Sequence, residues 1–228
     1  VNGAKMFITS GMRADWTTVA VRTGGPGASG VSLLGIERDT PGFTRTELKK
    51  MGWWASDTAE LSFDDCRVPA SNLIGAEGQA FPLIMRNFNG ERLTLAASSC
   101  GAAQACLEDA VAWARERKTF GQPLIAHQVI RHKLVDMAER IEATRALIDD
   151  LASRLDAGEQ PVAQTAMAKN YAARTMQFCA DAAVQILGGS GYMRGVRVER
   201  IYREVKVMMI GGGAEEVLKD LAARQLGF

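Results

Sequence analysis

Few side chains in this sequence have both the type and the spacing that catalysis or metal binding requires. The two histidines, His127 and His132, stand five positions apart, which does not place them on one face of a helix. A Gly-x-Ser-x-Gly motif is absent, and no serine or cysteine has an adjacent base. The sequence therefore predicts neither a metal centre nor a hydrolase with a serine or cysteine nucleophile.

A string of three glycines near the end of the chain is the most unusual local feature. Gly211, Gly212 and Gly213 precede a predicted helix that starts near Ala214 and carries two glutamates in its first turn. The string could be a binding loop, because glycine lets the backbone approach a ligand closely. It could equally be an ordinary bend before a last helix, where the helix dipole favours the glutamates. The local pattern leaves both interpretations open.

Composition excludes several classes of protein. The 228 residues are 47% hydrophobic and 23% charged, which predicts a soluble globular protein of one or two domains. The net charge of +1 gives no broad attraction to nucleic acid or anionic lipid, and no apolar run approaches the length of a membrane span. The four cysteines form no Cys-x-x-Cys pair, so we interpret them as core residues of a cytoplasmic protein.

The elements that must position the polar residues change once along the chain. Residues 1–75 contain short apolar clusters separated by turn-forming residues, which predicts a compact β-region. The glycine-rich run at 24–30 has no Lys-Ser or Lys-Thr after it, so we expect a hairpin connection there and not a phosphate loop. Because Val1 falls within a strand pattern, we expect the chain to be a fragment whose natural start is missing.

After Gly78 the apolar residues recur at helical spacing. The pattern predicts a first helix of more than 35 residues, a second from near Val129 to Asp156 and a third over about 162–187. Gly158 and Pro161 are placed to end the second helix. Long helices with short connections favour an antiparallel bundle, and alanine-rich faces indicate its core or an interface between subunits.

Five longer strings are similar, in order and in spacing, to the acyl-CoA dehydrogenase family. Any one of them would be weak support, but together they cover nearly the whole chain. They are NGAKMFITSGMRADWTTVAVRT at 2–23, MGWWASDTAELSFDDCRVPASNLIG at 51–75, ARERKTFGQPLIAHQVIRHKLVDMA at 114–138, QILGGSGYMRGVRVERIYREVKV at 185–207, and GGGAEEVLKDLAARQLG at 211–227.

The resemblance implies an α+β fold and a flavin-dependent activity. Residues 1–75 would form part of a middle β-domain of barrel or sandwich type, and residues 76–228 an antiparallel four-helix bundle. The family's N-terminal helical domain would be absent from this chain. The implied reaction is α,β-dehydrogenation of an acyl-CoA thioester with non-covalent FAD. A base removes the α-proton, a hydride leaves the β-carbon for the flavin N5, and hydrogen bonds stabilise the developing negative charge on the thioester oxygen.

The resemblance also suggests where the base lies. Many family members carry a glutamate in the loop before the last helix, but Gly212 occupies that place here and cannot accept a proton. Long-chain and isovaleryl-type members carry the glutamate on the first long helix, before an arginine, and Glu91 with Arg92 matches that string. We therefore expect Glu91 to be the base, although most helix glutamates are simply solvated. Glu215 or Glu216 would be the next candidates.

Other site residues carry over from the family position by position. Phe7, Ile8 and Thr9 match contacts to the flavin ring, although Phe7 and Ile8 could equally be β-core residues. Arg92 and Ser56 resemble positions near the CoA moiety. The remaining matches are to FAD-contacting positions, some of which the family draws from a neighbouring subunit: Arg117, Thr119, Phe120, Gln128, Gln185, Gly188, Gly189 and Glu216.

Shared cofactor sites imply a homodimer or homotetramer, and the family implies electron-transfer flavoprotein as the redox partner. Two alternatives stay open beside the dehydrogenase. The chain could be a non-catalytic fragment or paralogue that acts only in assembly or binding, because the N-terminal part is missing. It could also be related to acyl-CoA oxidases, which pass electrons to oxygen. The acyl chain length is not readable from the sequence.

Overall fold

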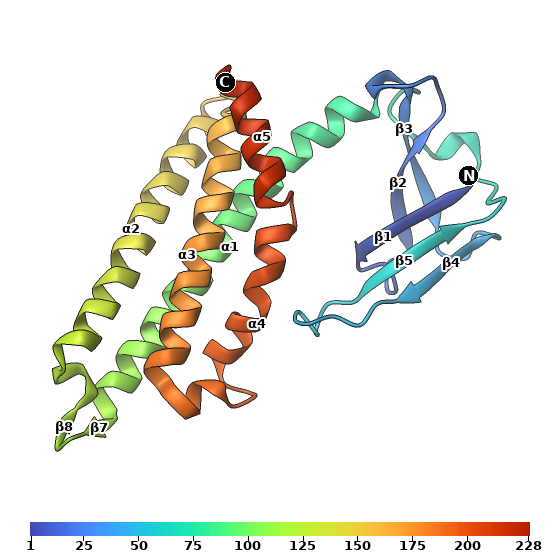
Figure 1. The fold of residues 1–228 in the computed structure, drawn as a ribbon. Coiled ribbons are helices and arrows are strands. Elements are labelled where there is room, and N and C mark those ends of the chain that lie inside the picture. The colour runs from blue at the N-terminus through green and yellow to red at the C-terminus, as the bar shows by residue number, and fades with distance from the viewer. The chain divides into compact units, whose positions relative to one another are not determined.

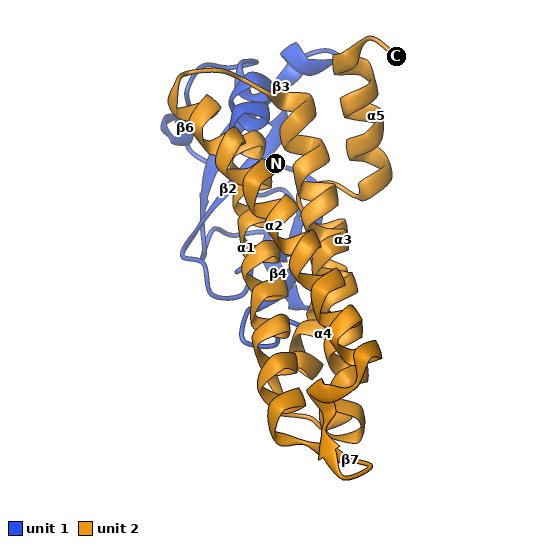
Figure 2. Cartoon of the chain, turned by 90° about the vertical axis from the view of Figure 1, so that its left-hand side faces the viewer, with its two compact units in different colours: residues 1–87 blue, residues 88–228 orange.

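The computed structural model describes residues 1–228 and divides into two compact units. The first unit comprises Val1–Asn87 and the second Phe88–Phe228 (Figure 2). Strands dominate the first unit and helices the second, in the order that the change of apolar spacing predicts. The predicted α+β fold, a partial β-domain followed by a helical domain, is confirmed.

The first unit contains two antiparallel three-stranded sheets (Figure 1). In one sheet the strand order is β1, β5, β4, with β1 at Gly3–Thr9, β4 at Phe43–Glu47 and β5 at Thr58–Phe63. In the other it is β2, β3, β6, with β2 at Trp16–Arg22, β3 at Val31–Glu37 and β6 at Leu73–Ile74. Because β2 and β3 pair antiparallel over their full lengths, the glycine-rich run between them is the predicted hairpin connection.

The core of this unit follows from alternation along the strands. Ala59, Leu61 and Phe63 of β5 are buried, whereas Ser62 between them is exposed, as the period of two in a strand requires. The ring of Phe63 stacks on that of Phe43 from β4, with centroids 4.7 Å apart. These pairs hold together the sheet that carries β1, the strand with the predicted flavin contacts.

The second unit is built from five helices and a small hairpin. The helices are α1 at Ala80–Glu116, α2 at Gln128–Asp156, α3 at Val162–Leu187, α4 at Arg197–Ile210 and α5 at Glu215–Leu226. The hairpin pairs β7 at Lys118–Thr119 with β8 at Gln122–Pro123. The residues of α1 before Phe88 belong to the first unit.

Helix α3 is the centre of the helical unit, with α2, α4 and α5 packed against it (Figure 1). Its alanines explain this position, because side chains without bulk let neighbouring helices approach on several sides. Buried alanines recur along it from Ala163 to Ala183, so of the two predicted roles for this alanine-rich string, core or subunit interface, these residues have the core role. The cysteines predicted as core residues are all buried and free. No helix combines the length and apolar character that a membrane crossing requires.

Helix α4 is the one α-helix that sequence analysis did not assign. Its buried residues, Val198, Ile201, Val205 and Met208, recur at helical spacing along one face. Charged residues fill most of the other positions up to Lys206, and Arg203 contacts Glu199 one turn earlier in the helix. The short length of α4, between two glycine-containing loops, obscures this pattern in the sequence.

Candidate functional site

The Gly211–Gly213 loop lies between α4 and α5 and packs on α1. Gly212 has a φ of 70° and Gly213 a φ of 115°, a region of backbone space that residues with a Cβ rarely adopt. A Cβ built on Gly212 would lie 2.5 Å from the Leu95 Cδ1 atom of α1. A glutamate at position 212 would thus be strained by the backbone and would require Leu95 to move.

Arg92 on α1 connects that helix directly to the loop. Its Nε donates a hydrogen bond to the Gly212 carbonyl oxygen at 3.1 Å, and its Nη1 donates to Asn89 Oδ1 at 3.1 Å. The guanidinium also lies over the Phe88 ring, 5.8 Å from its centroid. Only 7% of the Arg92 surface is exposed, and this burial lowers the pKa of Arg92, an effect that the neighbouring Glu91 charge opposes.

Two residues of α3 hold the next part of the loop. The Lys169 ammonium donates a hydrogen bond to the Gly213 carbonyl oxygen at 2.8 Å, although only 1% of this residue is exposed. Burial, followed by the positive charge of Arg92, lowers the pKa of Lys169 to about 8, against the attraction of Glu215. Asn170 donates through Nδ2 to the Glu215 carbonyl oxygen at 3.1 Å, and its buried Oδ1 has no hydrogen-bond partner.

The carboxylates near the loop differ in their surroundings. Glu91 is exposed on α1, directly before the buried Arg92. Glu215 lies 2.7 Å from Lys219 Nζ and 3.6 Å from Arg174 Nε, and these cations, the Lys219 hydrogen bond foremost, lower the pKa of Glu215. A carboxylate with a lowered pKa is a weaker base, so Glu215 is poorly suited to remove a carbon-bound proton. Glu216, predicted to contact FAD, is exposed in the first turn of α5.

The residues predicted to contact the diphosphate and adenosine of FAD lie around the β7–β8 hairpin. Thr119 Oγ1 lies 3.1 Å from His127 Nε2, and the Phe120 ring packs edge-on against the same histidine. Phe120 is 98% exposed and has a φ of 51°. Arg117 is exposed just before the hairpin, and Gln128 is exposed at the start of α2. The structure therefore brings these four predicted residues together.

Gln185, Gly188 and Gly189 lie where α3 ends. Gly188 follows the last residue of the helix with a φ of 60°, and it begins a short 3-10 turn that contains Gly189. All three residues are exposed. They lie at the same end of the helical unit as the β7–β8 hairpin, which is the lower end in Figure 1, and away from the Gly211–Gly213 loop.

The predicted flavin-ring contacts lie on β1 of the first unit. Phe7 occupies an irregularity in the pairing of β1 with β5, between Lys5 and Ile8, with a φ of 62° and 76% of its surface exposed. Ile8 packs against the β-core, and Thr9 is exposed opposite Thr58. The bulge therefore separates the two apolar neighbours, so that Phe7 faces solvent and Ile8 faces the core.

Ser56, predicted to lie near the CoA moiety, stands in the turn before β5. Its backbone N–H donates to the Trp53 carbonyl oxygen at 3.1 Å, and its own carbonyl oxygen accepts from Lys50. The residue is half-buried. The other residue of this prediction, Arg92, directs its guanidinium to Gly212 and Asn89 within the chain.

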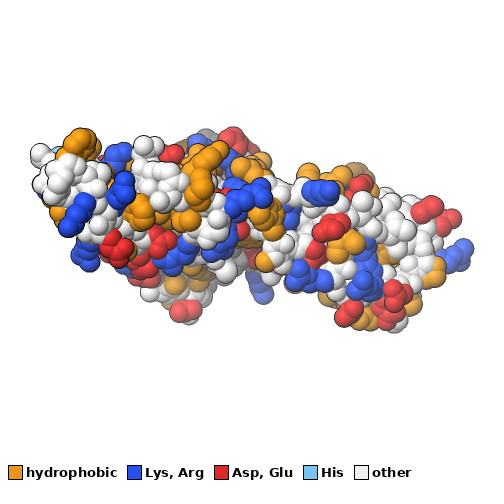
Figure 3. Space-filling model, turned by 90° about the horizontal axis from the view of Figure 1, so that it is seen from below, with side chains coloured by type: hydrophobic (Ala, Val, Ile, Leu, Met, Phe, Trp, Pro, Cys, Tyr) orange, Lys and Arg blue, Asp and Glu red, His pale blue; other side chains and the backbone are white.

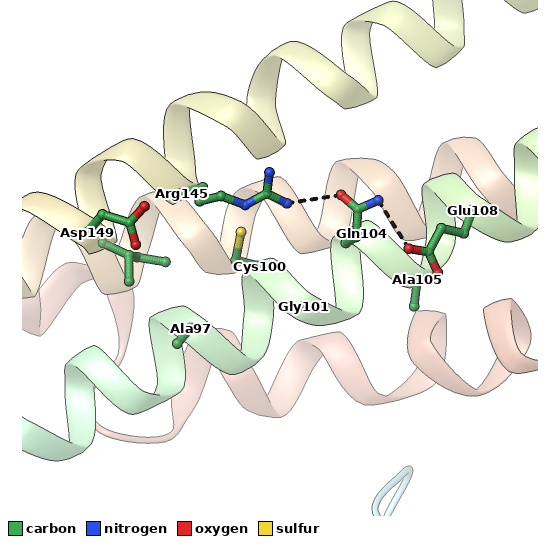
Figure 4. Close-up of a pocket in the computed structure, with 9 residues that line it drawn as sticks. Ala97, Cys100, Gly101, Gln104, Ala105, Glu108, Arg145 and Asp149 are labelled. Atoms are coloured by element: carbon green, nitrogen blue, oxygen red, sulfur yellow. Dashed lines mark hydrogen bonds between the residues drawn. The ribbon is translucent and has the colours of Figure 1, made fainter. Parts of the chain in front are cut away.

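A cavity in the helical unit contains none of the predicted site residues. This cavity of about 390 Å³ lies between α1 and α2, where small side chains such as Ala97 and Gly101 leave room and Arg145 bonds Gln104 at the rim (Figure 4). Figure 3 shows basic and acidic side chains interspersed on the face that it draws. No group of three potential metal-ligating side chains occurs in the structure.

Sequence analysis missed three residues that the structure places next to predicted ones. Lys169 and Asn170 occupy buried positions in the apolar alanine-rich string of α3, where polar residues are uncommon. The interruption of an apolar string by two polar residues was the sequence signal that could have identified both. His127 was considered only as a metal ligand, and its hydrogen bonds to Thr119 and Gln122 depend on a hairpin that the sequence does not make obvious.

Comparison with known protein families assigns both units of the chain to one family. The middle domain of acyl-CoA dehydrogenases matches residues 1–66, and their C-terminal domain matches residues 78–227. This chain belongs to the acyl-CoA dehydrogenase family, as the sequence strings predict.

Individual relatives agree with this assignment. An acyl-CoA dehydrogenase of Bacillus subtilis is 41% identical over 99% of this chain and 60% of its own length. A mitochondrial isobutyryl-CoA dehydrogenase of Dictyostelium discoideum is 41% identical over 99% of this chain and 55% of its own. The crystal structure of a putative acyl-CoA dehydrogenase from Mycobacterium smegmatis is 48% identical, covers 100% of this chain and 60% of that one, and superposes with a TM-score of 0.98. The chain thus spans three-fifths or less of these relatives.

Proposed function

We propose that the protein to which this chain belongs catalyses the FAD-dependent α,β-dehydrogenation of an acyl-CoA thioester. The observation that carries the proposal is the convergence of α1 and the Gly211–Gly213 loop. Arg92, which follows the candidate base Glu91, holds the carbonyl of Gly212, the position that replaces the base of other family members. The two alternative locations for a base thus adjoin one another, and only one of them carries a carboxylate.

In this proposal Glu91 accepts the α-proton of the substrate. Glu91 is accessible to a substrate because it is exposed on α1. Glu215, the nearby alternative, is paired with Lys219 and Arg174 and has a lowered pKa. Gly212 has no side chain that could compete, and its backbone conformation disfavours one. Of the three positions, Glu91 is therefore the one proposed as the base.

Gly212 contributes its backbone N–H, which donates to the thioester carbonyl oxygen as negative charge develops there. The Gly211 N–H donates to the Val207 carbonyl oxygen at 2.7 Å, at the end of α4, whereas the Gly212 N–H has no acceptor within the chain. Gly212 is also exposed. A backbone donor that is exposed and has no acceptor within the chain is suited to a substrate oxygen.

The residues present fit a flavin dinucleotide. Phe7 and Phe120 are exposed aromatic side chains on backbone of positive φ, a conformation that costs about 1 kcal/mol or more for residues with a Cβ. Exposed and strained aromatics are expected where a ligand ring covers them. Arg117 would bind the diphosphate, for which a guanidinium fork is well suited. The chemistry that FAD supplies when bound is acceptance of a hydride equivalent from the substrate β-carbon.

The domain division, the oligomeric state and the electron acceptor are proposed from the family resemblance. We propose a division of the chain near residue 75 into middle and C-terminal domains, with a helical domain preceding them in the whole protein. We propose a homodimer or homotetramer, because the hairpin residues around Phe120 lie at the other end of the helical unit from the glycine loop and would contact the FAD bound to a second copy. The proposed location is the cytoplasm. Electron-transfer flavoprotein is the proposed electron acceptor.

The decisive experiment is reduction of the flavin by a panel of straight, branched and terpenoid acyl-CoA substrates, measured on the full-length protein by stopped-flow absorbance. Glu91→Gln should retain FAD but lose several orders of magnitude in the rate of flavin reduction, because the amide cannot accept the proton. Glu108→Gln, on the same helix beside Gln104, should react like the wild type.

Near-wild-type reduction by Glu91→Gln would remove Glu91 from the role of base. Absence of FAD from the purified full-length protein would favour the non-catalytic alternative. Rapid formation of hydrogen peroxide with acyl-CoA, in the absence of electron-transfer flavoprotein, would instead place the protein among the acyl-CoA oxidases.

A further inference from the structure

The turn that follows β1 is bound by one residue of the segment that leads into β5. Asp57, directly before β5, accepts a hydrogen bond from the Met12 N–H at 2.7 Å through Oδ2 and another from Arg13 Nε through Oδ1. Its own backbone carbonyl oxygen accepts from the Ser10 N–H at 3.1 Å. Asp57 therefore binds three positions of the Ser10–Arg13 turn.

The Asp57 carboxylate is directed into the chain and not into solvent. Only 11% of its side chain is exposed, against 60% of that of Arg13. Burial raises the pKa of Asp57, but the hydrogen bonds from Met12 and Arg13 outweigh this effect and leave the pKa below its ordinary value. The group is thus ionised at neutral pH. Because both of its oxygens accept hydrogen bonds from the turn, Asp57 can influence a ligand only through that turn.

The end of β1 has few other attachments to its sheet. The pairing of β1 with β5 is interrupted between Lys5 and Ile8, and beyond the interruption two residue pairs join Ile8 and Thr9 to β5. A strand end attached by so few pairs opens easily unless the chain beyond it is fixed. The Ser10 N–H shares its peptide plane with the Thr9 carbonyl, so its hydrogen bond to Asp57 fixes that plane.

Packing of the turn against β5 restrains it in a second direction. Gly11 is buried, and a Cβ added there would lie 2.7 Å from the Ala59 Cβ and 3.0 Å from the Ile8 carbonyl oxygen. There is consequently no space for the turn to move toward β5. Movement away from β5 is opposed by the hydrogen bonds to Asp57, which would have to break.

We propose that Asp57 is a positioning residue, which holds the Ser10–Arg13 turn and thereby keeps Phe7 and Thr9 of β1 in the orientation that contacts the flavin ring. The inference rests on the proposed function for the presence of the flavin, whereas the restraint on the turn does not depend on that function. A strand end that is ordered in advance loses less conformational freedom when FAD binds, so the restraint increases the affinity.

The test compares Asp57→Ala with the control Asp15→Ala in the full-length protein. Asp15 belongs to the same unit, but 87% of its side chain is exposed and its ion pair with Arg38 spans 3.9 Å. Asp57→Ala should raise hydrogen exchange in residues 8–14 and raise the Kd for FAD by about 10-fold, measured by reconstitution of the apoprotein. Asp15→Ala should leave both measurements within about twofold of the wild type.

A spectrum recorded at saturating FAD separates positioning from general stability. Under this condition every folded chain carries the flavin, so a loss of stability alone leaves the shape of the visible absorbance band unchanged. Displaced contacts from Phe7 and Thr9 should instead blur the shoulders of the band in Asp57→Ala. Asp57→Asn retains an oxygen that can accept from the Met12 N–H, and its spectrum should lie between those of the wild type and Asp57→Ala.

Wild-type exchange in residues 8–14 of Asp57→Ala, or raised exchange together with a wild-type Kd and spectrum, would overturn the proposal. If Asp57→Ala does not fold, Asp57→Asn takes its place and should give smaller changes in the same directions. If the wild-type protein binds no FAD, the proposed function fails, and with it the role of Asp57 toward the flavin. The exchange of residues 8–14 then decides alone whether Asp57 restrains the turn.

Discussion

The Gly211–Gly213 loop and the β7–β8 hairpin both carry predicted site residues on backbone of positive φ. They differ in how many contacts they make with the rest of the chain. The loop is bound from two sides by buried cations, Arg92 and Lys169. The hairpin presents Phe120 almost fully to solvent, and a Cβ added at the neighbouring Gly121 would meet nothing within 4 Å. The loop is organised by its own chain, whereas the tip of the hairpin is not.

This difference indicates which region is ordered before a ligand binds and which region can be ordered by the ligand or by a second copy. A backbone donor that stabilises developing charge must be held in place before the substrate arrives, because reorganisation during the reaction raises the barrier. A residue that contacts a cofactor or a second copy can be covered at the moment of binding. Substitutions in the loop should therefore affect the stability of the chain, and substitutions in the hairpin should affect association.

Arg92→Met should have the largest effect on stability. It leaves the Gly212 and Asn89 oxygens without their charged donor, and we expect the free energy of unfolding to fall by roughly 3 kcal/mol. Urea denaturation followed by far-ultraviolet circular dichroism measures this change. Arg117→Met, which alters an exposed arginine beside the hairpin, should change it by less than about 0.5 kcal/mol. Equal losses in both variants would contradict the comparison.

A pair of glycine substitutions compares the backbone of the Gly211–Gly213 loop with that of the β7–β8 hairpin. Gly213→Ala places a Cβ 2.8 Å from Leu218 Cδ2 at a φ of 115°, so it should destabilise by about 2 kcal/mol or more. Gly121→Ala meets open space at a φ of 80° and should cost about 1 kcal/mol through the backbone alone. The same denaturation experiment applies, and a larger loss for Gly121→Ala would reverse the expected order.

The pH dependence of stability should report the buried lysine. Lys169 has a pKa of about 8 in the folded chain against the ordinary 10.5, so between these values the unfolded chain binds more protons. The free energy of unfolding should consequently rise with pH over this interval, by at most about 1.4 kcal/mol per pH unit. This contribution should be missing in Lys169→Met. Identical alkaline profiles for the two proteins would show that Lys169 has an ordinary pKa when folded.

Phe120→Ala should have the smallest effect on stability, within about 0.5 kcal/mol of the wild type, because the ring is almost wholly exposed. Its effect should be on association. We expect a weaker retention of FAD and a shift toward smaller assemblies in full-length protein, measured by flavin absorbance and by analytical ultracentrifugation. A stability loss comparable to that of Gly213→Ala would mean that the hairpin, too, is organised by its own chain.

Local patterns predicted the long helices well. The expected end of the second helix at Asp156 and the third helix at 162–187 agree with α2 and α3, because caps and helical spacing are encoded over a few neighbouring residues. Gly158, beyond the end of α2, has a φ of 86°, a conformation that favours glycine at the end of a helix. Helix α4 was missed because a short amphipathic segment between glycine-rich loops resembles a continuous connection.

The candidate site was predictable only in part. Family strings placed Glu91, Arg92 and the glycine loop on the sequence, and Arg92 was expected to lie near the CoA moiety. The direction of its guanidinium toward Gly212 could not be predicted, since a side chain's partner depends on packing between helices. The roles assigned to Glu91, the FAD contacts and Ser56 stay predictions.

The sequence by itself determined the family, the order of a β-region and long helices, and the replacement of a loop glutamate by Gly212. These properties reside in residue types and in spacings of a few positions. Tertiary structure alone decided that Arg92 and Lys169 meet at adjacent carbonyl groups of the loop, across 120 and 44 positions of the chain. The physical reason is that a hydrogen bond depends on distances of about 3 Å, which only the packing of α1 and α3 around the loop can set.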